Sequence, residues 1–164
     1  MVPGFDLVVL AKQCAPQVHV ITTEAIVRQE SGGNPFAIGV VGGSLVRQPR
    51  SLGEALATAR GLEANGWNFS VGLAQINLRN FARLGLTVES AFDPCRNLGA
   101  MQSVLHECWV RAKGKSAAAE SSSVRAALSC YYSGSLTFGQ QSGYVDSVIA
   151  NARVARQAAV QQPP

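Results

Sequence analysis

Apolar residues recur at helical spacing along most of this 164-residue chain, and the runs are bounded by residues that start or stop helices. The clearest run begins at Ser51, where the pattern S-x-x-E is typical of a capping box. Apolar residues follow at positions 52, 55, 56, 59 and 62, and Asn65-Gly66 closes the helix. Each such helix must bury one face against another element, so the pattern predicts a mostly α fold.

The same signals predict about six or seven helices in all. A short helix over 5–13 is broken by Pro16. The next helix, capped by Thr22 or Thr23, runs to about Ser31. Further helices are expected within 78–86, where Gly85 stops the helix, from Asp93-Pro94 onward, over 124–131 and from Tyr144 onward.

Residues 36–50 interrupt the helical pattern with glycines and β-branched residues, which predicts a loop or a small β-ribbon. Ala117–Ser123 is a small-residue linker or the start of a helix. We expect one domain over residues 1–156, because a chain of this length is typical of a single domain. Residues 157–164 are polar and end in two prolines, which is typical of a tail or linker.

Composition narrows the function classes. The chain is 47% hydrophobic and carries a net charge of +4, with no block of Lys or Arg. A mildly basic surface favours an anionic polymer such as the cell wall over nucleic acid, since no basic stripe interleaved with aromatics appears. The longest apolar run, at 7–11, is too short to span a bilayer and makes a poor signal peptide. Met1 is therefore expected to start a mature chain that has lost its leader.

Four cysteines occur, at spacings of 81, 13 and 22 residues, without the close pairs of a zinc site. Two disulfides in an exported domain are the favoured interpretation, and four buried free thiols are the alternative. Three pairings are possible, and spacing alone does not choose between them.

The stretch "QESGGNP" at 29–35 places Glu30 in the last turn of a predicted helix, just before a break at Gly32 and Gly33. A helix C-terminus is an unfavourable place for a negative charge. Glu30 is therefore either an ordinary solvated residue or a carboxyl whose surroundings disfavour its charged form.

Three further short motifs follow Glu30-Ser31: "GLAQIN" at 72–77, "ALSCYYSG" at 127–134 and "GYV" at 143–145. In this order they resemble the motifs of the lytic transglycosylase branch of the lysozyme-like superfamily. The resemblance covers roughly residues 5 to 156. The sequences "CAP" at 14–16, "DPCRNL" at 93–98 and "CYYSG" at 130–134 are most similar to the specialised enzymes associated with type IV secretion systems.

The resemblance implies a lysozyme-like fold and one catalytic residue, Glu30. In this family a single carboxyl protonates the glycosidic oxygen between N-acetylmuramic acid (MurNAc) and N-acetylglucosamine (GlcNAc). The carboxylate then accepts the proton of the muramic 6-hydroxyl, and the product is a 1,6-anhydro sugar. This chemistry requires the pKa of Glu30 to lie well above the ordinary value of about 4.3. Burial at a helix C-terminus acts in that direction.

Glycosidases that use two carboxylates need a second Asp or Glu at a defined distance from the first. None of the available candidates lies in a motif-like setting, and Glu54 is better explained as a helix cap. These candidates are Glu24, Glu63, Glu89, Asp93 and Glu107. Their settings fit non-hydrolytic cleavage, in which the N-acetyl group of the substrate stabilises the cation.

The resemblance also assigns substrate-binding roles to Ser31, Gly72, Gln75, Asn77, Tyr131 and Tyr144. Each has a structural alternative: Ser31 can satisfy a backbone carbonyl, the 72–77 segment can be a structural turn, and both tyrosines can be packing aromatics. The chain departs from the family pattern at Ala74, which replaces Met, and at Tyr132, which replaces Asn; Ser135-Leu136 is a third departure. Trp67 is a weak candidate for stacking on sugar, whereas Trp109 is expected in the core. His19 and His106 receive no chemical role.

The helix directions implied by the resemblance favour one disulfide pairing. They place Cys14 and Cys108 away from the cleft and Cys95 near it, and a helix from 97 to 108 is too long for Cys95 to reach Cys108. The expected pairing is therefore Cys14–Cys108 and Cys95–Cys130.

Together these inferences predict a monomeric periplasmic lytic transglycosylase that acts on peptidoglycan strands without metal or organic cofactor. Components of a secretion, conjugation or pilus machine are expected partners. The alternatives are a hydrolase of the same fold and a non-catalytic wall-binding module. A nucleic-acid binder is a distant third, which steep salt dependence of DNA binding would reveal.

Overall fold

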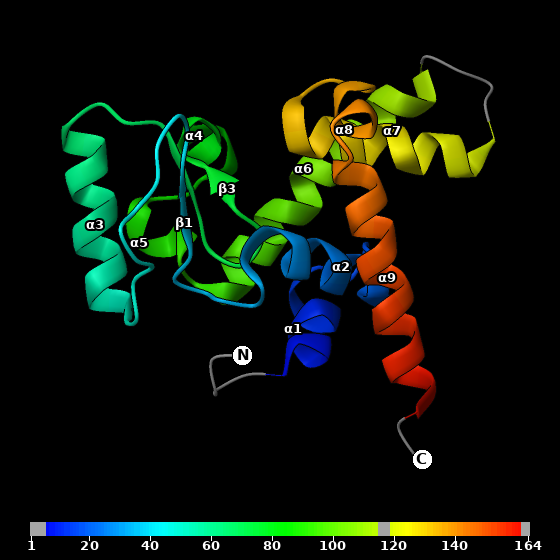
Figure 1. Ribbon diagram of the computed structural model, residues 1–164, viewed down its shortest axis with the longest axis horizontal. Helices are drawn as coiled ribbons and strands as arrows, with labels where there is room; N and C mark the ends of the chain where they lie inside the picture. The colour runs from blue at the N-terminus through cyan, green and yellow to red at the C-terminus, as the bar shows by residue number, and fades with distance from the viewer. Residues whose placement is uncertain (1–5, 115–118, 162–164) are drawn as a thin grey trace. The chain divides into compact units, whose positions relative to one another are not determined.

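The computed structural model describes residues 6–114 and 119–161 and shows a mostly helical chain with one small sheet (Figure 1). The chain divides into two compact units after Met101. The helices of the first unit are α1 (Leu7–Cys14), α2 (Val20–Ser31), α3 (Leu52–Ala64), η1 (Leu78–Asn80), α4 (Phe81–Leu84) and α5 (Val88–Ala91). Helix α6 (Pro94–Gly114) runs across the division, and the second unit adds α7 (Glu120–Ser133), α8 (Phe138–Gln141) and α9 (Tyr144–Gln161).

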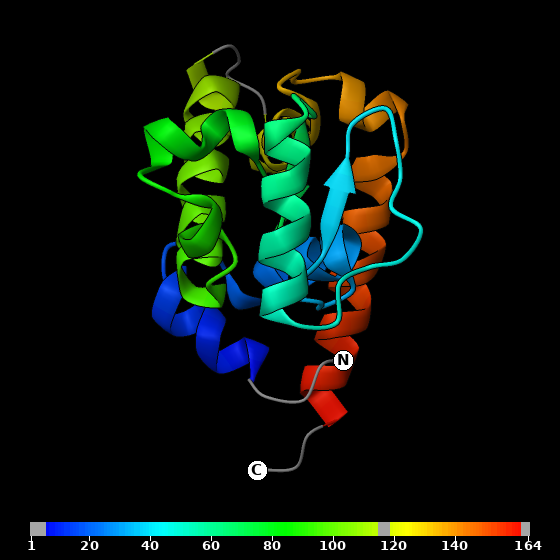
Figure 2. The same ribbon diagram turned by 90° about the vertical axis from the view of Figure 1, so that its left-hand side faces the viewer.

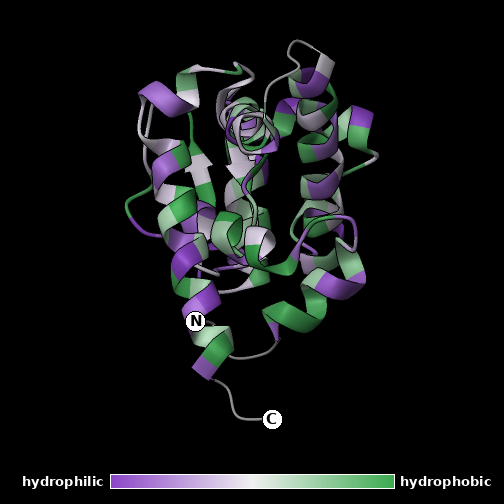
Figure 3. Cartoon of the chain, turned by 90° about the vertical axis from the view of Figure 1, so that its right-hand side faces the viewer, coloured by the Kyte–Doolittle hydropathy of each residue, from purple (hydrophilic) through white to green (hydrophobic). Residues whose placement is uncertain are grey.

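The local signals that start and stop helices act as predicted at several points. Ser51 caps α3, since its Oγ accepts a hydrogen bond from the Glu54 amide at 3.2 Å. Gly32 and Gly85 end α2 and α4 with φ angles of 62° and 64°, the left-handed conformation that glycine adopts without strain. The mostly α fold is therefore confirmed, and Figure 3 shows hydrophilic and hydrophobic residues alternating along the helices.

The start of α2 is not where the sequence placed it. The cap is His19, whose Nδ1 accepts a hydrogen bond from the Ile21 amide at 3.2 Å, and the helix begins at Val20. Thr22 and Thr23 lie inside the helix, and Thr23 is fully buried. The predicted threonine cap is wrong because the ring nitrogen of His19 accepts the bond that a threonine oxygen was expected to accept.

The sheet of the first unit is built from three short antiparallel strands in the order β1-β2-β3. These strands are β1 (Ile38–Val40), β2 (Phe69–Val71) and β3 (Ile76–Asn77), with Ile38 opposite Val71 and Val71 opposite Ile76. The β-prone segment 36–50 thus supplies one strand, but its partners come from residues 69–77, where no strand was expected. Helix α3 lies alongside β1 (Figure 2).

The outer edge of β1 is completed by a side chain. Gln48 Oε1 accepts a hydrogen bond from the Ile38 amide at 2.8 Å, and Gln48 Nε2 donates to the Ile38 carbonyl at 2.9 Å. The glutamine amide therefore satisfies the two backbone groups of Ile38 that a neighbouring strand would otherwise satisfy.

Each unit holds buried apolar side chains of its own. The largest fully buried side chains of the first unit include Phe69, Phe92, Ile26 and Leu98. In the second unit Cys108, Ala127 and Cys130 form a buried cluster, against which Leu105, Trp109 and Leu136 pack. Trp109 is thus part of the packing of the second unit, as its position on the helical stripe predicts.

Two disulfides are present, as predicted, but their pairing differs. Cys14 bonds Cys95 with a Cα–Cα distance of 5.1 Å, and Cys108 bonds Cys130 with 5.6 Å. The expected pairing was wrong because it separated the end of α1 from the start of α6. In the structure these two ends are in contact, since a Cβ added to Gly99 would lie 3.5 Å from the Cys14 carbonyl oxygen.

Three further sequence predictions concern the C-terminal tail, the linker before α7 and membrane-spanning segments. Helix α9 continues to Gln161, so most of the segment 157–164 extends the last helix. Of the predicted linker Ala117–Ser123, residues 117 and 118 lie outside the described residues, and α7 begins at Glu120. No helix in the described part of the chain has the length and apolar character needed to cross a membrane.

Candidate functional site

Glu30 lies in the last turn of α2, one residue before the helix ends at Ser31. Its side chain is partly buried. The chain leaves the helix through Gly32 and Gly33, with φ angles of 62° and 85°, and a Cβ at either position would meet nothing within 4 Å. The two glycines are therefore explained by the turn rather than by crowding.

The hydroxyl of Ser31 connects the first motif to the second. Ser31 Oγ lies 2.7 Å from the carbonyl oxygen of Leu73 and 3.2 Å from that of Val27, and it accepts a hydrogen bond from the Gly33 amide at 3.2 Å. A hydroxyl has one proton, and the shorter distance makes Leu73 its main acceptor. Ser31 thus holds the "GLAQIN" segment against the end of the Glu30 helix.

Asn97, in the first turns of α6, organises the same segment, although no role was predicted for it. Its Oδ1 accepts a hydrogen bond from the Ala74 amide at 2.8 Å. Its Nδ2 donates to the carbonyls of Val71, at 2.9 Å, and Ala91, at 2.8 Å. The side chain is fully buried. The signal that could have revealed it is the Asn of "DPCRNL", a polar residue at an otherwise apolar helical position.

Gly72 is required by this contact. Its φ is 81°, and a Cβ at this position would lie 2.3 Å from Asn97 Nδ2 and 3.1 Å from the Ala91 carbonyl oxygen. Side chains do not tolerate such distances, so only glycine lets Asn97 approach the backbone. This is a structural reason for Gly72; its proposed approach to a saccharide stays a prediction.

Gln75 and Asn77 both make hydrogen bonds inside the first unit. Gln75 is the one non-glycine residue with a positive φ, 50°, in the described chain, and its Nε2 donates to the carbonyls of Ala37 and Gly72, each at 3.1 Å. Asn77 Nδ2 donates to Ser70 Oγ at 3.1 Å, and its Oδ1 caps η1. Backbone conformations of the Gln75 kind cluster at functional sites because surrounding contacts must hold them.

The aromatic residues of the third and fourth motifs belong to the second unit. Tyr131 is partly buried near the end of α7, and Tyr144 is 7% exposed in the first turn of α9. The Tyr144 ring stacks on Tyr132, with centroids 4.3 Å apart and planes within 12°. Tyr132, which was noted only as a departure from the family pattern, therefore covers the ring that was expected to face a sugar.

The other carboxylates differ clearly in their surroundings. Burial raises the pKa of Glu24, nearby Arg28 partly offsets this, and Asp6 adds to it. Hydrogen bonds from Arg47 and Arg60 lower the pKa values of Glu54 and Glu89, respectively. Glu54 and Glu89 are thus committed to ion pairs on the surface of the first unit. Among residues 6–114 and 119–161, no cluster of three or more His, Cys, Asp or Glu could hold a metal ion.

The shifted pKa of Glu24 predicts a pH effect on stability. Because its pKa is raised on folding, the folded chain binds more protons than the unfolded chain, and the free energy of unfolding falls as pH rises from about 4.3 through the folded pKa. Glu24→Gln should therefore exceed the wild type in stability at neutral pH, by under about 1 kcal/mol, since Glu24 is only partly buried. The gain should vanish on acidification.

Glu54→Gln is the matched control, with the opposite sign. The pKa of Glu54 is lowered on folding, so its contribution to stability is present at neutral pH and is lost as pH falls through the folded value. Urea unfolding of both variants at several pH values measures this. A Glu24→Gln variant that is less stable than the wild type at neutral pH would contradict the burial argument.

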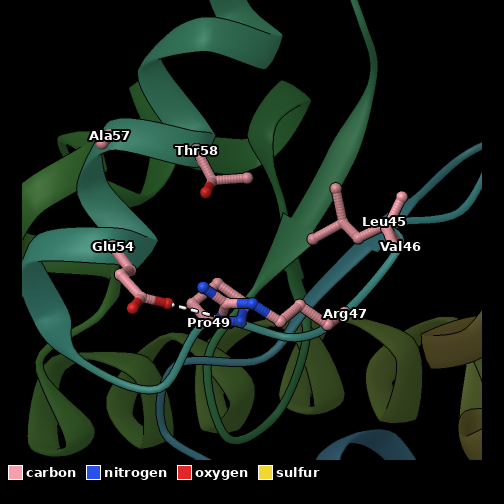
Figure 4. Close-up of a pocket in the computed structure, with 7 residues that line it drawn as sticks. All are labelled: Leu45, Val46, Arg47, Pro49, Glu54, Ala57 and Thr58. Carbon is pink, nitrogen blue, oxygen red and sulfur yellow. Dashed lines mark hydrogen bonds and ion pairs between the residues drawn. The ribbon is translucent and has the colours of Figure 1, made fainter.

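A surface pocket of about 330 Å³ lies between the loop that follows β1 and helix α3 (Figure 4). It is lined by Leu45, Val46, Arg47, Pro49, Glu54, Ala57 and Thr58. The Arg47–Glu54 ion pair crosses it, and none of the motif residues lines it. Trp67, the weak candidate for sugar stacking, is 46% exposed and lies against Gly43, because a Cβ there would be 3.5 Å from its ring.

Comparison with known proteins agrees with these features. The family described as the transglycosylase SLT domain matches residues 8–153. A type IV secretion system protein virB1 of Brucella abortus is 52% identical over an alignment of 159 residues that covers 94% of this chain and 66% of the relative. Protein virB1 of Agrobacterium fabrum is 38% identical over 140 residues, 84% of this chain and 56% of the relative.

The chain thus spans just under two thirds of the length of the Brucella relative and a smaller part of the Agrobacterium one. No solved structure matches it at a significant level. The family match extends over nearly all of the described residues and includes all four motifs. The chain therefore belongs to the family of transglycosylase SLT domains.

Proposed function

We propose that this protein is a peptidoglycan lytic transglycosylase that cleaves the β-1,4 bond between MurNAc and GlcNAc without consuming water. The observation that carries the proposal is the junction at the end of α2. There the partly buried Glu30 precedes Ser31, whose hydroxyl is bonded to the Leu73 carbonyl of "GLAQIN". Two motifs separated by about forty residues are thus joined at the residue next to Glu30, in a chain that belongs to the SLT family.

In the proposed reaction, Glu30 begins as a carboxylic acid. It gives its proton to the glycosidic oxygen as the bond from C1 to that oxygen breaks, and the GlcNAc product leaves with the proton. The N-acetyl group of the substrate stabilises the positive charge at C1. The Glu30 carboxylate then takes the proton of the muramic 6-hydroxyl while O6 bonds to C1. The acid is regenerated and a 1,6-anhydro end forms.

The remaining residues are proposed to bind and orient the glycan. Ser31 would orient the substrate beside Glu30, and Gln75 and Asn77 would bind N-acetyl and hydroxyl groups. Gly72, Tyr131 and Tyr144 complete the proposed set. The hydrogen bonds that fix Ser31, Gln75 and Asn77 support this proposal, because polar groups held by the fold lose little freedom when a ligand binds.

The setting is proposed from the relatives. The Brucella relative is named a type IV secretion system protein virB1, and the Agrobacterium relative is named protein virB1. We therefore assign this protein to local opening of the cell wall for such a machine, in the periplasm, with peptidoglycan strands as substrate and secretion-system components as partners. The two disulfides support an exported location, since disulfides persist in oxidising compartments. We also propose that the protein is a monomer.

Digestion of purified sacculi tests the reaction. Muropeptides released by the purified protein should end in 1,6-anhydro-MurNAc, which is lighter by one water than a hydrolysed end. Mass spectrometry of the products measures this directly. Hydrolysed ends would contradict the proposal in favour of a muramidase. Binding to sacculi with no soluble product at any pH would contradict it in favour of a non-catalytic wall-binding module.

A further inference from the structure

Two aromatic side chains of the second unit are unusually exposed. Tyr132, at the end of α7, is 48% exposed, and Phe138, at the start of α8, is 51% exposed. Their rings are parallel within 2°, with centroids 6.3 Å apart. Large aromatics carry much apolar surface, so a parallel pair left half in water points to a ligand that covers it.

The ring of Tyr132 is held in position by a buried neighbouring ring. Tyr144, which is 7% exposed, stacks on Tyr132 with centroids 4.3 Å apart, so three near-parallel rings join α7, α8 and α9. The ion pair between Arg125 and Asp146, at 2.6 Å, ties α7 to α9 on the same unit. The Tyr132 ring is thus positioned by a buried neighbour rather than left as a loose surface side chain.

Hydroxyl groups fix the turn that carries Phe138. The fully buried Ser129 donates through Oγ to the Ser135 carbonyl and accepts from the Gly139 amide, both at 2.7 Å. Ser135 Oγ in turn accepts from the Phe138 amide at 3.2 Å. A Cβ on Gly139 would lie 2.7 Å from Ser129 Cα, so α8 packs directly on α7. Phe138 is therefore held in place before any ligand arrives.

We infer that Tyr132 and Phe138 form an aromatic platform that binds a pyranose ring of the glycan strand, an inference that rests on the proposed function. A pyranose presents a face of C–H groups that suits an aromatic ring, and its hydroxyl groups suit a polar rim. Ser133, at the end of α7, and Ser135 and Thr137, in the connection to α8, supply such a rim, because all three are exposed or partly exposed. A protein partner would instead favour a broad apolar core.

The place of the platform in the sequence supports the same ligand. Tyr132 stands inside "CYYSG" and Tyr144 inside "GYV", so the stack joins the two motifs of the second unit. The platform also accounts for Tyr132, which stands where the family pattern has Asn. At this position the face of an aromatic ring would contact the sugar in place of an amide group. Phe138 lies outside every motif and is assigned here to substrate binding.

Binding of a chito-oligosaccharide, measured by calorimetry in a Glu30→Gln background, tests the platform without cleavage. Tyr132→Ala and Phe138→Ala should each raise Kd by about fivefold to tenfold, a typical loss for one stacked ring. Tyr132→Phe keeps the ring and should stay within about twofold. Val124→Ala, which truncates a 40% exposed side chain on the same helix, should leave Kd unchanged.

Two further results separate the platform from the proposed reaction. In the active protein, which retains Glu30, Tyr132→Ala should raise KM and leave kcat unchanged. The ring contributes equally to binding of the substrate in the ground state and in the transition state. Unchanged Kd in both alanine variants, with circular dichroism and melting temperature like those of the parent, would overturn the platform and favour a protein contact. If the wild type yields no anhydro ends but its binding depends on Tyr132, the reaction fails and the platform stands.

Discussion

Replacing Glu30 with Gln should abolish release of anhydro-muropeptides, with a loss of activity by a factor of about 10³ or more. Glutamine has nearly the shape of glutamic acid, but its amide neither gives a proton to the glycosidic oxygen nor takes one from the 6-hydroxyl. Both proton transfers are assigned to one carboxyl, so one substitution removes both. The side chain lies in the last turn of α2 and is only partly buried, so the fold should persist.

Mass spectrometry of sacculus digests measures the loss, and a pelleting assay with intact sacculi measures binding, which Glu30→Gln should retain. Glu24→Gln is the matched control, because it makes the same change on the same helix, six residues earlier, and should keep wild-type activity. Glu30→Asp moves the carboxyl back by one methylene and should cost about 10²-fold. Undiminished activity of Glu30→Gln would exclude Glu30 as the acid.

Signals that act within a few residues were readable from the sequence. Ser51 predicts the start of α3 and Gly85 the end of α4, because a cap hydrogen bond or a left-handed residue is a local event. The junction of Glu30 with a break was likewise visible, since it depends only on where α2 ends. These signals define helices and place a carboxyl at a helix end, but they do not say what packs against it.

Features that join distant segments were not readable in the same way. Strands β2 and β3 are too short for a periodic signal and exist because β1 pairs with β2. The disulfide pairing depends on the contact between the end of α1 and the start of α6. The stack of Tyr132 on Tyr144 depends on how α7 and α9 approach, and no spacing in the sequence records that approach.

The same distinction between local signals and long-range contacts applies to the candidate site. The motifs identified which residues matter, and the resemblance supplied a role for Glu30. The structure adds what holds the second motif in place: the Ser31 hydroxyl joins it to the first motif, and the Asn97 side chain joins it to α6. Both bonds span more than twenty residues, so neither could be inferred from local pattern alone. They make the "GLAQIN" segment a part of the first unit that is held in place rather than a free loop.

Asn97→Ala should therefore be among the most destabilising single changes in the first unit. It removes three hydrogen bonds at a fully buried position, those that Asn97 makes with the Ala74 amide and with the carbonyls of Val71 and Ala91. An unsatisfied buried polar group costs about 1–3 kcal/mol, so three should cost about 3 kcal/mol or more. Asn80→Ala is the control: its surface bond with Arg83 should be worth less than about 0.5 kcal/mol.

Urea unfolding of Asn97→Ala, Gly72→Ala and the double variant completes the test as a cycle. Gly72→Ala should be destabilising by itself, because the new Cβ would meet Asn97 Nδ2 at 2.3 Å at a φ of 81°. In the double variant the missing Asn97 side chain gives that Cβ room. The combined loss should therefore fall short of the sum of the single losses by about 1 kcal/mol or more. Simple additivity would show that Asn97 and Gly72 do not act as one contact, and that the 72–77 segment is held in place by other means.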